Sequence, residues 1–368
     1  MKLLRKIFQS LIFIVTVLAA IFLIASAFSD RISPNLSPAC TFLGLSFPFI
    51  LALNILFLFG WIIAWKWTKI AIPLAAIFFS LGAVKSYFPV NIAQANPPEE
   101  SIKILTYNVM QFEHQRQHTE KNPNPILKYI IDSEADIVCV QEYGAQDSNN
   151  HLSNKTIRQA LKKYPHQRVQ KLKWINKEET YGLAIFSKFP ILSFENMDFE
   201  SLYNGAFIAE LDIDGERLTL INCHLESSKL SMEDRHEYAN IISEFNPEKF
   251  DEFTWKMMDK LTPAYKLRAK QAEEIASKIA QNNNKYIVVC GDFNDTPVSY
   301  VRHTISKKLE DAFANSGFGL GTTYNRNNFY FRIDYIMHSS NIKSYKTRVD
   351  KILNSDHYPV SSYLQLLD

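Results

Sequence analysis

The chain has 368 residues, enough for more than one folded unit, and 47% of them are hydrophobic. Residues 1–96 hold seven of the 40 basic residues and one of the 38 acidic residues, which leaves residues 97–368 with a net charge of −4. A slightly acidic region lacks the broad basic surface of a strong non-specific nucleic-acid binder, although it can still contain a local basic groove.

Three apolar segments predict a membrane domain in residues 1–90. The expected transmembrane helices cover about residues 7–28, 41–65 and 70–88. The first two are long enough to cross a bilayer, for which roughly 20 residues suffice. The third has a short uncharged core and could instead be re-entrant. A cleaved signal peptide is the alternative for the first segment, but its apolar part would span only about 7 to 15 residues, and further apolar segments follow.

Basic residues predict the orientation of this membrane domain. Lys2, Arg5 and Lys6 precede the first segment, and Lys66 and Lys69 follow the second. Both positions are expected in the cytoplasm because cytoplasmic loops carry an excess of Lys and Arg. Three spans then place the C-terminal region outside the cytoplasm, in the periplasm of a bacterial cell. A re-entrant third segment would leave it in the cytoplasm. The expected partner is the lipid bilayer, and no obligate protein partner is predicted.

Residues 91–100 predict a linker, since adjacent prolines at 97 and 98 do not fit a helix or a central strand. A folded domain is expected over residues 101–368, where apolar strands alternate with helices. The expected strands are 102–107, 136–140, 207–213, 217–222, 286–289, 332–337 and 358–364. The expected helices are 126–131, 156–164 and 264–281. Mixed strand pairing with helices outside predicts a layered α/β fold with two sheets face to face.

Polar side chains recur where these predicted strands begin or end. They are Asn108, Glu142, His224, Asp292, Asn294, Asp334, Asp356 and His357. Each alone fits a plainer interpretation as a cap, a turn or a solvated loop residue. Sheets of this class, however, bind ligands beyond their strand ends, and oxygen ligands beside a carboxylate suit metal-assisted phosphate chemistry. The set therefore predicts one common site.

The order of these motifs resembles the endonuclease/exonuclease/phosphatase superfamily, which includes DNase I, apurinic endonucleases and neutral sphingomyelinases. The blocks ILTYN, VQE, INCHL, GDFN, RIDYI and SDHYP follow one another across about residues 101–366, each next to an apolar strand. The resemblance implies a four-layer α/β sandwich of the DNase I type. The superfamily also includes inositol polyphosphate 5-phosphatases, but the W-C-D-R block expected of those enzymes is absent from this sequence.

The resemblance implies a metal site. Glu142 would be the principal carboxylate ligand of Mg²⁺, with Asn108 beside it and Asp356 as a further ligand. Mn²⁺ is an alternative cation, because both ions accept hard oxygen ligands.

It also implies catalytic roles. Asp292 would orient or deprotonate the attacking water, and Asn294 would hold that water or a phosphoryl oxygen. His357 would pair with Asp334, which favours the imidazolium form and makes His357 a positive donor or a proton carrier. His224 would bind another phosphoryl oxygen or protonate the leaving group. The choice between Asp292 and His357 as general base stays open at this stage.

Two further segments have alternative interpretations. Arg268 lies in an R-x-x-Q-A pattern common in the superfamily and would bind substrate, or it serves only helix solvation and packing. Residues 245–265 are rich in aromatic and apolar side chains such as Phe253 and Trp255. This insertion is either an amphipathic lid that meets lipid or a helix buried against the same domain.

The expected activity is that of a membrane-anchored, metal-dependent phosphodiesterase or endonuclease-type hydrolase. Its substrate is a phosphate ester, with nucleic acid and phospholipid as competing classes. The alternatives are a lipid or small-metabolite phosphatase and a catalytically inactive, membrane-tethered binding scaffold.

Overall fold

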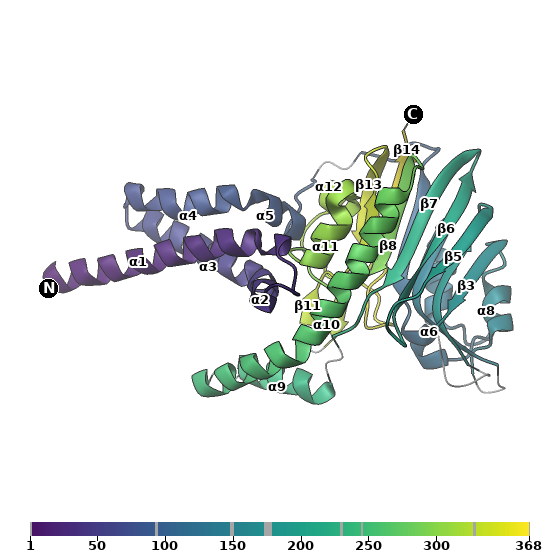
Figure 1. Ribbon diagram of the computed structural model, residues 1–368, viewed down its shortest axis with the longest axis horizontal. Helices are drawn as coiled ribbons and strands as arrows, with labels where there is room; N and C mark the ends of the chain where they lie inside the picture. The colour runs from purple at the N-terminus through teal and green to yellow at the C-terminus, as the bar shows by residue number, and fades with distance from the viewer. Residues whose placement is uncertain are drawn as a thin grey trace.

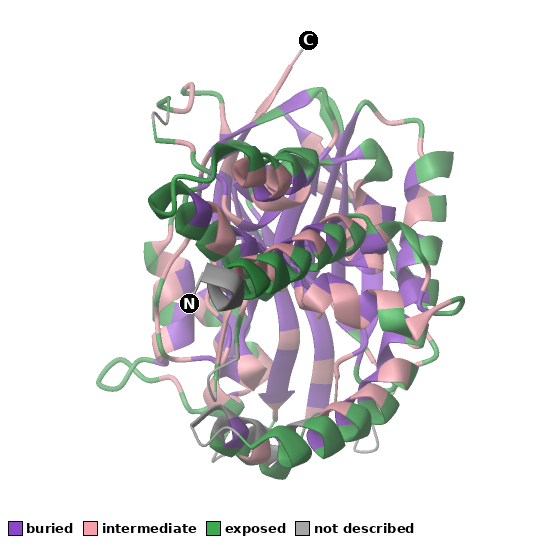
Figure 2. Ribbon diagram, turned by 90° about the vertical axis from the view of Figure 1, so that its left-hand side faces the viewer, coloured by how far each residue is buried: buried purple, intermediate pink, exposed green. Residues whose placement is uncertain are grey.

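A helical arm projects from one end of a two-sheet body (Figure 1). The computed structural model describes residues 2–92, 95–147, 151–172, 179–228, 231–243, 246–326 and 329–367. The arm consists of α1 (Lys2–Ala27), the short turn η1 (Ser29–Arg31), α2 (Pro38–Leu45), α3 (Phe47–Ile63), α4 (Trp67–Phe79) and α5 (Leu81–Tyr87). Figure 2 looks along the arm towards the body and shows exposed residues on the arm and buried residues on the strands behind it.

The expectation of three uninterrupted transmembrane helices is corrected. Among the described helices, one stretch, Lys6–Arg31, is by itself long and apolar enough to cross a membrane. The segment expected at 41–65 is the pair α2 and α3, bent by 53°, and the segment expected at 70–88 is the pair α4 and α5, bent by 63°. Pro48 explains the first bend because it has no N–H to donate to Gly44. Ser80 and Gly82 flank the second bend, and such residues commonly accompany kinks.

Two polar side chains inside the arm donate hydrogen bonds to partners within it. Asn54 is fully buried and donates from Nδ2 to the carbonyl oxygens of Ala19 and Ile50. Trp61 donates from Nε1 to Thr16 Oγ1 over 3.1 Å. Large apolar side chains cover much of the outside of α1; they are Ile7, Phe8, Leu11, Ile14, Val15, Leu18, Ile21 and Phe22.

The body is built on two six-stranded sheets. In order, the first contains β13 (Ile342–Val349), β14 (Val360–Leu366), β1 (Ile102–Asn108), β2 (Ile137–Gln146), β4 (Glu179–Ser187) and β3 (His166–Lys171). The second contains β5 (Ile191–Met197), β6 (Gly205–Ile213), β7 (Glu216–His224), β8 (Tyr286–Asp292), β12 (Asp334–His338) and β9 (Glu310–Asp311). The central pairs β1/β2 and β7/β8 are parallel and the other pairs are antiparallel. A small hairpin joins β10 (Tyr324–Arg326) to β11 (Phe329–Phe331).

The main core lies between the sheets, where Ile104 and Cys139 of one sheet pack in one cluster with Leu220 and Cys290 of the other. Helices cover the outer faces. They include α7 (Pro125–Asp132) and α8 (Asn154–Ala160) on the first sheet, and α10 (Pro247–Gln281) and α11 (Tyr300–Ile305) on the second. The remaining helices are α6 (Met110–Gln115), α9 (Met232–Ser243), η2 (Ser306–Lys308) and α12 (Ala312–Ser316). This helix–sheet–sheet–helix order agrees with the expected layered fold.

Two helix boundaries differ from the sequence prediction. The helix expected at 156–164 ends at Ala160. The helix expected at 264–281 begins at Pro247, because α10 continues through Pro263 over 35 residues. Its first half contains most of the insertion and buries Phe253, Met257, Leu261 and Tyr265 in a cluster with Ile241 of α9 and Phe42 of α2. That face is therefore covered, partly by the arm, while Trp255 is exposed.

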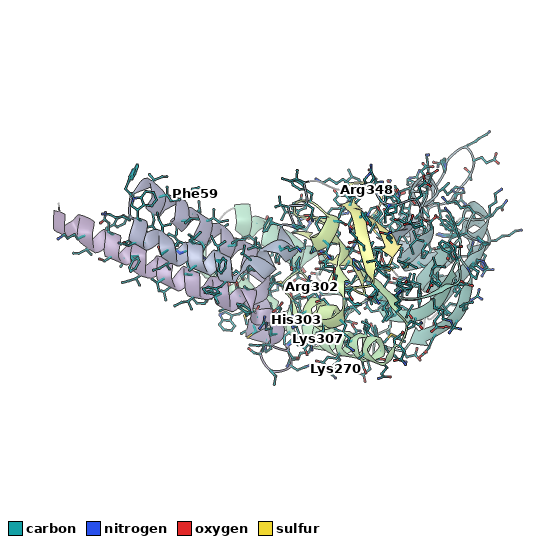
Figure 3. The ribbon with its side chains drawn as sticks, turned by 90° about the horizontal axis from the view of Figure 1, so that it is seen from above. Phe59, Lys270, Arg302, His303, Lys307 and Arg348 are labelled. Atoms are coloured by element: carbon teal, nitrogen blue, oxygen red, sulfur yellow. The ribbon has the colours of Figure 1, made fainter. Side chains whose placement is uncertain are left out.

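The arm packs directly on the body, a contact that the sequence does not predict. Val298, from the loop after β8, is buried among arm residues such as Leu23 and Phe47. Arg332 donates from Nη2 to the carbonyl oxygen of Ser86 at 2.6 Å and from Nη1 to Asp311 Oδ2 at 3.0 Å. Figure 3 shows Arg302 and His303 near this junction and Phe59 out on the arm. The proposed linker and domain limits stay predictions, and residues 93 and 94 lie outside the described residues.

Candidate active site

Strand register brings three of the predicted residues side by side. His224 ends β7 and pairs with Asp292 on the parallel strand β8. Asp334 begins β12 and pairs with Asp292 from the antiparallel side. Gly291 permits the close approach of β7 and β8, since a Cβ there would lie 1.9 Å from the carbonyl oxygen of Cys223. The glycine of the GDFN block therefore has a packing role beside the acidic residue.

Glu142 does not end a strand as expected. β2 continues to Gln146, and its pairing with β4 is interrupted between Val140 and Tyr143. Glu142 lies within this bulge with φ of 51°. Such a bulge redirects a side chain locally, and bulges are frequent beside active sites. Asn108 Nδ2 lies 3.1 Å from Glu142 Oε1 and 3.2 Å from Asp292 Oδ2, so its amide connects two carboxylates from different sheets.

His357 forms the expected pair with Asp334. Its Nδ1 lies 2.8 Å from Asp334 Oδ2, and its Nε2 lies 3.7 Å from Asp292 Oδ2. Burial by itself would lower the pKa of His357, but the charges of Asp334 and Asp292 outweigh it and raise that pKa well above the usual value. The pair therefore favours an imidazolium facing Asp292.

The pKa of Asp292 is shifted as well. Burial raises its pKa to about 7, although His357 and hydrogen bonds from the Asn294 backbone and the Asn108 side chain act in the opposite direction. Asn294 N–H donates to Asp292 Oδ1 at 2.8 Å, and Asn294 Nδ2 donates to the carbonyl oxygen of Leu225 at 2.9 Å. An amide nitrogen carries two hydrogens, so Asn294 retains one for a further acceptor.

His224 has the opposite protonation preference from His357. Its Nε2 lies 3.6 Å from Asp292 Oδ2 and 3.9 Å from Glu142 Oε1. Burial and the positive charge of His357 lower the pKa of His224 to about 3. Two histidines in one site thus differ in charge at neutral pH, His224 being neutral and His357 positive.

A cavity of about 300 Å³ collects most of these groups. The predicted site residues that line it are Glu142, His224, Asp292, Asn294, Asp356 and His357. Asn108 and Asp334 do not line the cavity themselves, but each forms a hydrogen bond with a residue that does: Asn108 with Glu142, and Asp334 with His357. Six predicted positions from separate parts of the chain therefore share one space.

Arg268 lies apart from the cavity surface. Its side chain is fully buried, with the guanidinium carbon 4.4 Å from the ring centre of Tyr265. Nη2 lies 3.3 Å from the hydroxyl oxygen of Ser228, which does line the cavity. The substrate-binding role predicted for Arg268 stays a prediction, and its position favours action through Ser228 and Tyr265.

Comparison with known proteins gives the family. The model of the endonuclease/exonuclease/phosphatase family matches residues 105–357. The chain belongs to this family. Family members hydrolyse phosphate esters and typically use a divalent cation. A second model, of a domain of unknown function, matches residues 6–87, and no curated protein matches the chain.

Two solved structures illustrate the endonuclease/exonuclease/phosphatase fold. One is an endonuclease/exonuclease/phosphatase from Beutenbergia cavernae, with 15% identity, a TM-score of 0.51, and coverage of 73% of this chain and 72% of that chain. The other is the human nocturnin catalytic domain with bound sulfate, with 17% identity, a TM-score of 0.50, and coverage of 74% and 96%. At these identities the likeness concerns the fold.

The donor set fits the divalent cation typical of the family. Burial raises the pKa of Glu142, and the charge of Asp356 raises it further, so two carboxylates face each other in one cavity. A cation between them would relieve this repulsion. Asp292, Asp334 and His357 also lie close enough to share an ion, with ligand atoms within 4.8 Å of one another. In that group, however, the side chains of Asp334 and His357 already form a hydrogen bond with each other.

Several lining residues were not predicted by the motifs. Tyr324 stacks edge-on against His357, with ring centres 5.2 Å apart. Leu45 of α2 and Leu261 and Tyr265 of α10 also line the cavity. No local pattern marks Leu45, Leu261 and Tyr265 as site residues, because they reach the cavity only through packing of the arm and the long helix. The composition of the insertion was the one sequence signal for the two α10 residues.

Proposed function

We propose that this chain is a membrane-anchored, metal-dependent phosphoesterase that hydrolyses a phosphodiester by attack of water. One observation carries the proposal: the acidic, amide and imidazole groups predicted from separate motifs line a single cavity. Membership of the endonuclease/exonuclease/phosphatase family supports phosphate-ester hydrolysis as the reaction.

Glu142 and Asp356 are the proposed ligands of Mg²⁺, or of Mn²⁺, with Asn108 fixing the orientation of Glu142 through its 3.1 Å hydrogen bond. When bound, such a cation withdraws negative charge from the phosphoryl oxygens. We favour these carboxylates over Asp334 and His357, because a ligand role there would compete with the 2.8 Å bond between those two side chains.

Asp292 is the proposed general base. A base must be able to accept a proton, and the raised pKa of His357 means that its imidazole is already protonated at neutral pH. Burial raises the pKa of Asp292 to about 7, which suits proton transfer near neutral pH. His357, held by Asp334, then supplies a positive N–H donor where negative charge develops on the phosphoryl group.

The other two residues complete the binding of the phosphoryl group. Asn294 Nδ2 has one hydrogen beyond that donated to Leu225, and it can donate this hydrogen to a phosphoryl oxygen. Neutral His224 can donate from Nε2 to a second oxygen or to the leaving group. Both contacts are hydrogen bonds without proton transfer, because the low pKa of His224 leaves no imidazolium at neutral pH to protonate the leaving group.

Exposed apolar side chains on α1 support anchoring in a bilayer. The N-terminus and the turn between α3 and α4 lie at the end of the arm far from the body (Figure 1). Lys6, Lys66 and Lys69 belong to this far end. The positive-inside tendency then supports a multi-pass arm with an extracytoplasmic body, periplasmic in a bacterial cell, provided that each bent helix pair crosses the membrane.

The test is hydrolysis of bis-p-nitrophenyl phosphate by the full chain in detergent, with Mg²⁺ and after EDTA treatment. EDTA is expected to abolish turnover, and added Mg²⁺ to restore it. Glu142→Gln should lose about 100-fold or more, in the range of a removed electrostatic contribution. The control is Glu195→Gln. Glu195 is an exposed residue of β5 in the second sheet that forms an ion pair with Lys278 of α10, and the variant should retain activity. Turnover that survives EDTA would contradict the proposal, and substrate binding without turnover would favour the inactive scaffold.

A further inference from the structure

We infer that the substrate is a membrane lipid, bound with its phosphate at Asp292 and His357 and its apolar part against a wall that the arm and α10 share. This inference rests on the proposed function and adds the substrate class. It starts from the composition of the cavity: besides the polar groups, the lining includes Leu45, Leu261, Tyr265, Phe331 and Ile333.

Leu45 is the residue that connects the cavity to the arm. It is the last residue of α2, and the body alone therefore does not complete the site. We call Leu45, Leu261 and Tyr265 the apolar wall. One side of this wall comes from the apolar N-terminal segment and the other from α10, so a ligand bound along it would contact both the arm and the body.

Close packing holds the two sides of the apolar wall together. A Cβ at Gly44 would lie 2.6 Å from the carbonyl oxygen of Val298, so α2 lies against the loop that follows the GDFN block. On the other side, the ring centre of Phe42 lies 5.6 Å from that of Tyr265 in an edge-to-face contact. The wall is therefore a built part of the cavity.

The apolar wall lies near the level expected for the membrane surface. α1 has 26 residues, which at ~1.5 Å per residue is enough to cross the ~30 Å hydrocarbon core. α2 follows α1 at its body end, after a connection in which Phe28, Ile32 and Leu36 are exposed. Exposed apolar residues beside α2 suit contact with lipid, and α2 itself carries Leu45 to the cavity.

The charges of the cavity favour a lipid over nucleic acid. Among the described residues that line it, none is Lys or Arg. Nucleic-acid binding depends largely on basic contacts to a row of phosphates. One phosphate, by contrast, can be bound by the cation that Glu142 and Asp356 would hold and by hydrogen-bond donors in the cavity such as Asn294 Nδ2. A small soluble ester would have no acyl chain to place along Leu45 and Leu261.

The experiment compares three substrates for the full chain in mixed micelles with Mg²⁺. They are an equimolar mixture of phosphatidylethanolamine, phosphatidylglycerol and sphingomyelin, a single-stranded DNA oligonucleotide, and bis-p-nitrophenyl phosphate. The lipid mixture is expected to be cleaved with the highest kcat/KM. Leu45→Gln should lower the ratio of lipid to soluble-ester kcat/KM about 10-fold, because one apolar contact with the lipid is lost. Leu261→Gln should act in the same direction and is the second variant if Leu45→Gln does not fold.

Leu192→Gln is the matched control, because Leu192 is half exposed on β5 and does not line the cavity. It should leave the substrate ratio unchanged. Cleavage of the soluble ester without cleavage of lipid, faster cleavage of DNA, or an unchanged ratio in both wall variants would overturn the lipid inference while the phosphoesterase proposal stands. A folded chain that cleaves none of the three substrates would overturn both.

Discussion

Gly44 of the arm packs against Val298 in the loop that follows strand β8 of the body. A Cβ at Gly44 would lie 2.6 Å from the carbonyl oxygen of Val298 and 2.7 Å from Ser29 Oγ. Val298 follows the GDFN block by four positions and is buried in the arm cluster that contains Leu23 and Phe47. The arm therefore supports the loop that follows Asp292 and strand β8, in addition to any role as an anchor.

Gly44→Ala tests this contact. The added Cβ meets backbone, which cannot move aside as a side-chain tip can, so we expect destabilisation of about 1–3 kcal/mol. The measurement is the Tm of the full chain in detergent. Gly60→Ala is the control, because a Cβ at Gly60 in α3 would meet nothing within 4 Å. Equal Tm values for the two variants would show that α2 and the loop are not closely packed.

Asp334→Asn should change the pH dependence of activity. Asp334 and Asp292 raise the pKa of His357 against the effect of burial, so the imidazolium persists above its usual pH range. Without the Asp334 charge, His357 should lose its proton at lower pH, and the alkaline limb of kcat/KM should move to lower pH. The rate at pH 8 should fall about 100-fold. The control Asp198→Asn alters an exposed residue, and an unmoved alkaline limb in Asp334→Asn would exclude His357 as the positive donor.

Arg332→Leu should destabilise the junction of arm and body. It removes the 3.0 Å ion pair with buried Asp311 and the hydrogen bond to Ser86. Burial alone would raise the pKa of Asp311, but Arg332 and Arg302 outweigh it and lower that pKa. The pair therefore stabilises the fold above the unfolded-state pKa of about 4 and loses this effect as the pH falls through the folded-state pKa.

We expect Arg332→Leu to cost about 3 kcal/mol at pH 7, since among the described residues it leaves Arg302, at 3.5 Å, as the remaining ion-pair partner of a buried carboxylate. The cost should shrink as the pH falls below about 4 towards the lowered folded-state pKa of Asp311, where the carboxyl becomes protonated in the folded state as well. The measurement is the free energy of unfolding of the variant and of the unchanged chain, at pH 7 and again below about pH 4. Arg348→Leu is the control because Arg348 is an exposed residue whose ion pair with Asp350 contributes little (Figure 3). A cost that does not depend on pH would contradict this account.

Mg²⁺ should stabilise the fold independently of any substrate. At about 100 times its Kd, a ligand that binds only the folded state adds ~2.7 kcal/mol. We expect a Tm increase with Mg²⁺ that EDTA reverses and that Glu142→Gln removes. Glu195→Gln, on the exposed side of β5, should retain the increase. If Glu142→Gln still responded to Mg²⁺, the cation would bind elsewhere, with Asp292, Asp334 and His357 as the next group to test.

Most of the body was predictable because its evidence is local. Apolar runs marked β1, β7 and β8, and the polar residues beside them, such as Asn108 and Asp292, could be located from residue type and spacing alone. The start of α10 was not predictable in this way. Proline is well suited to the first turn of a helix, so Pro263 gave no sign of the helical residues before it.

The sequence by itself determined which chemical groups are present, their order, and the strands that carry them, since these follow from residue type and from the spacing of apolar positions. Only the tertiary structure decided three further matters: the bulge that places Glu142 at the cavity, the bends that divide two of the three apolar segments, and the contact of Leu45 with the catalytic cavity. The bulge and the contact of Leu45 depend on pairing and packing between segments far apart in the chain, which leave no pattern within a short stretch of sequence. Pro48, Ser80 and Gly82 are local causes of the bends, but residue type alone does not fix the bend angles.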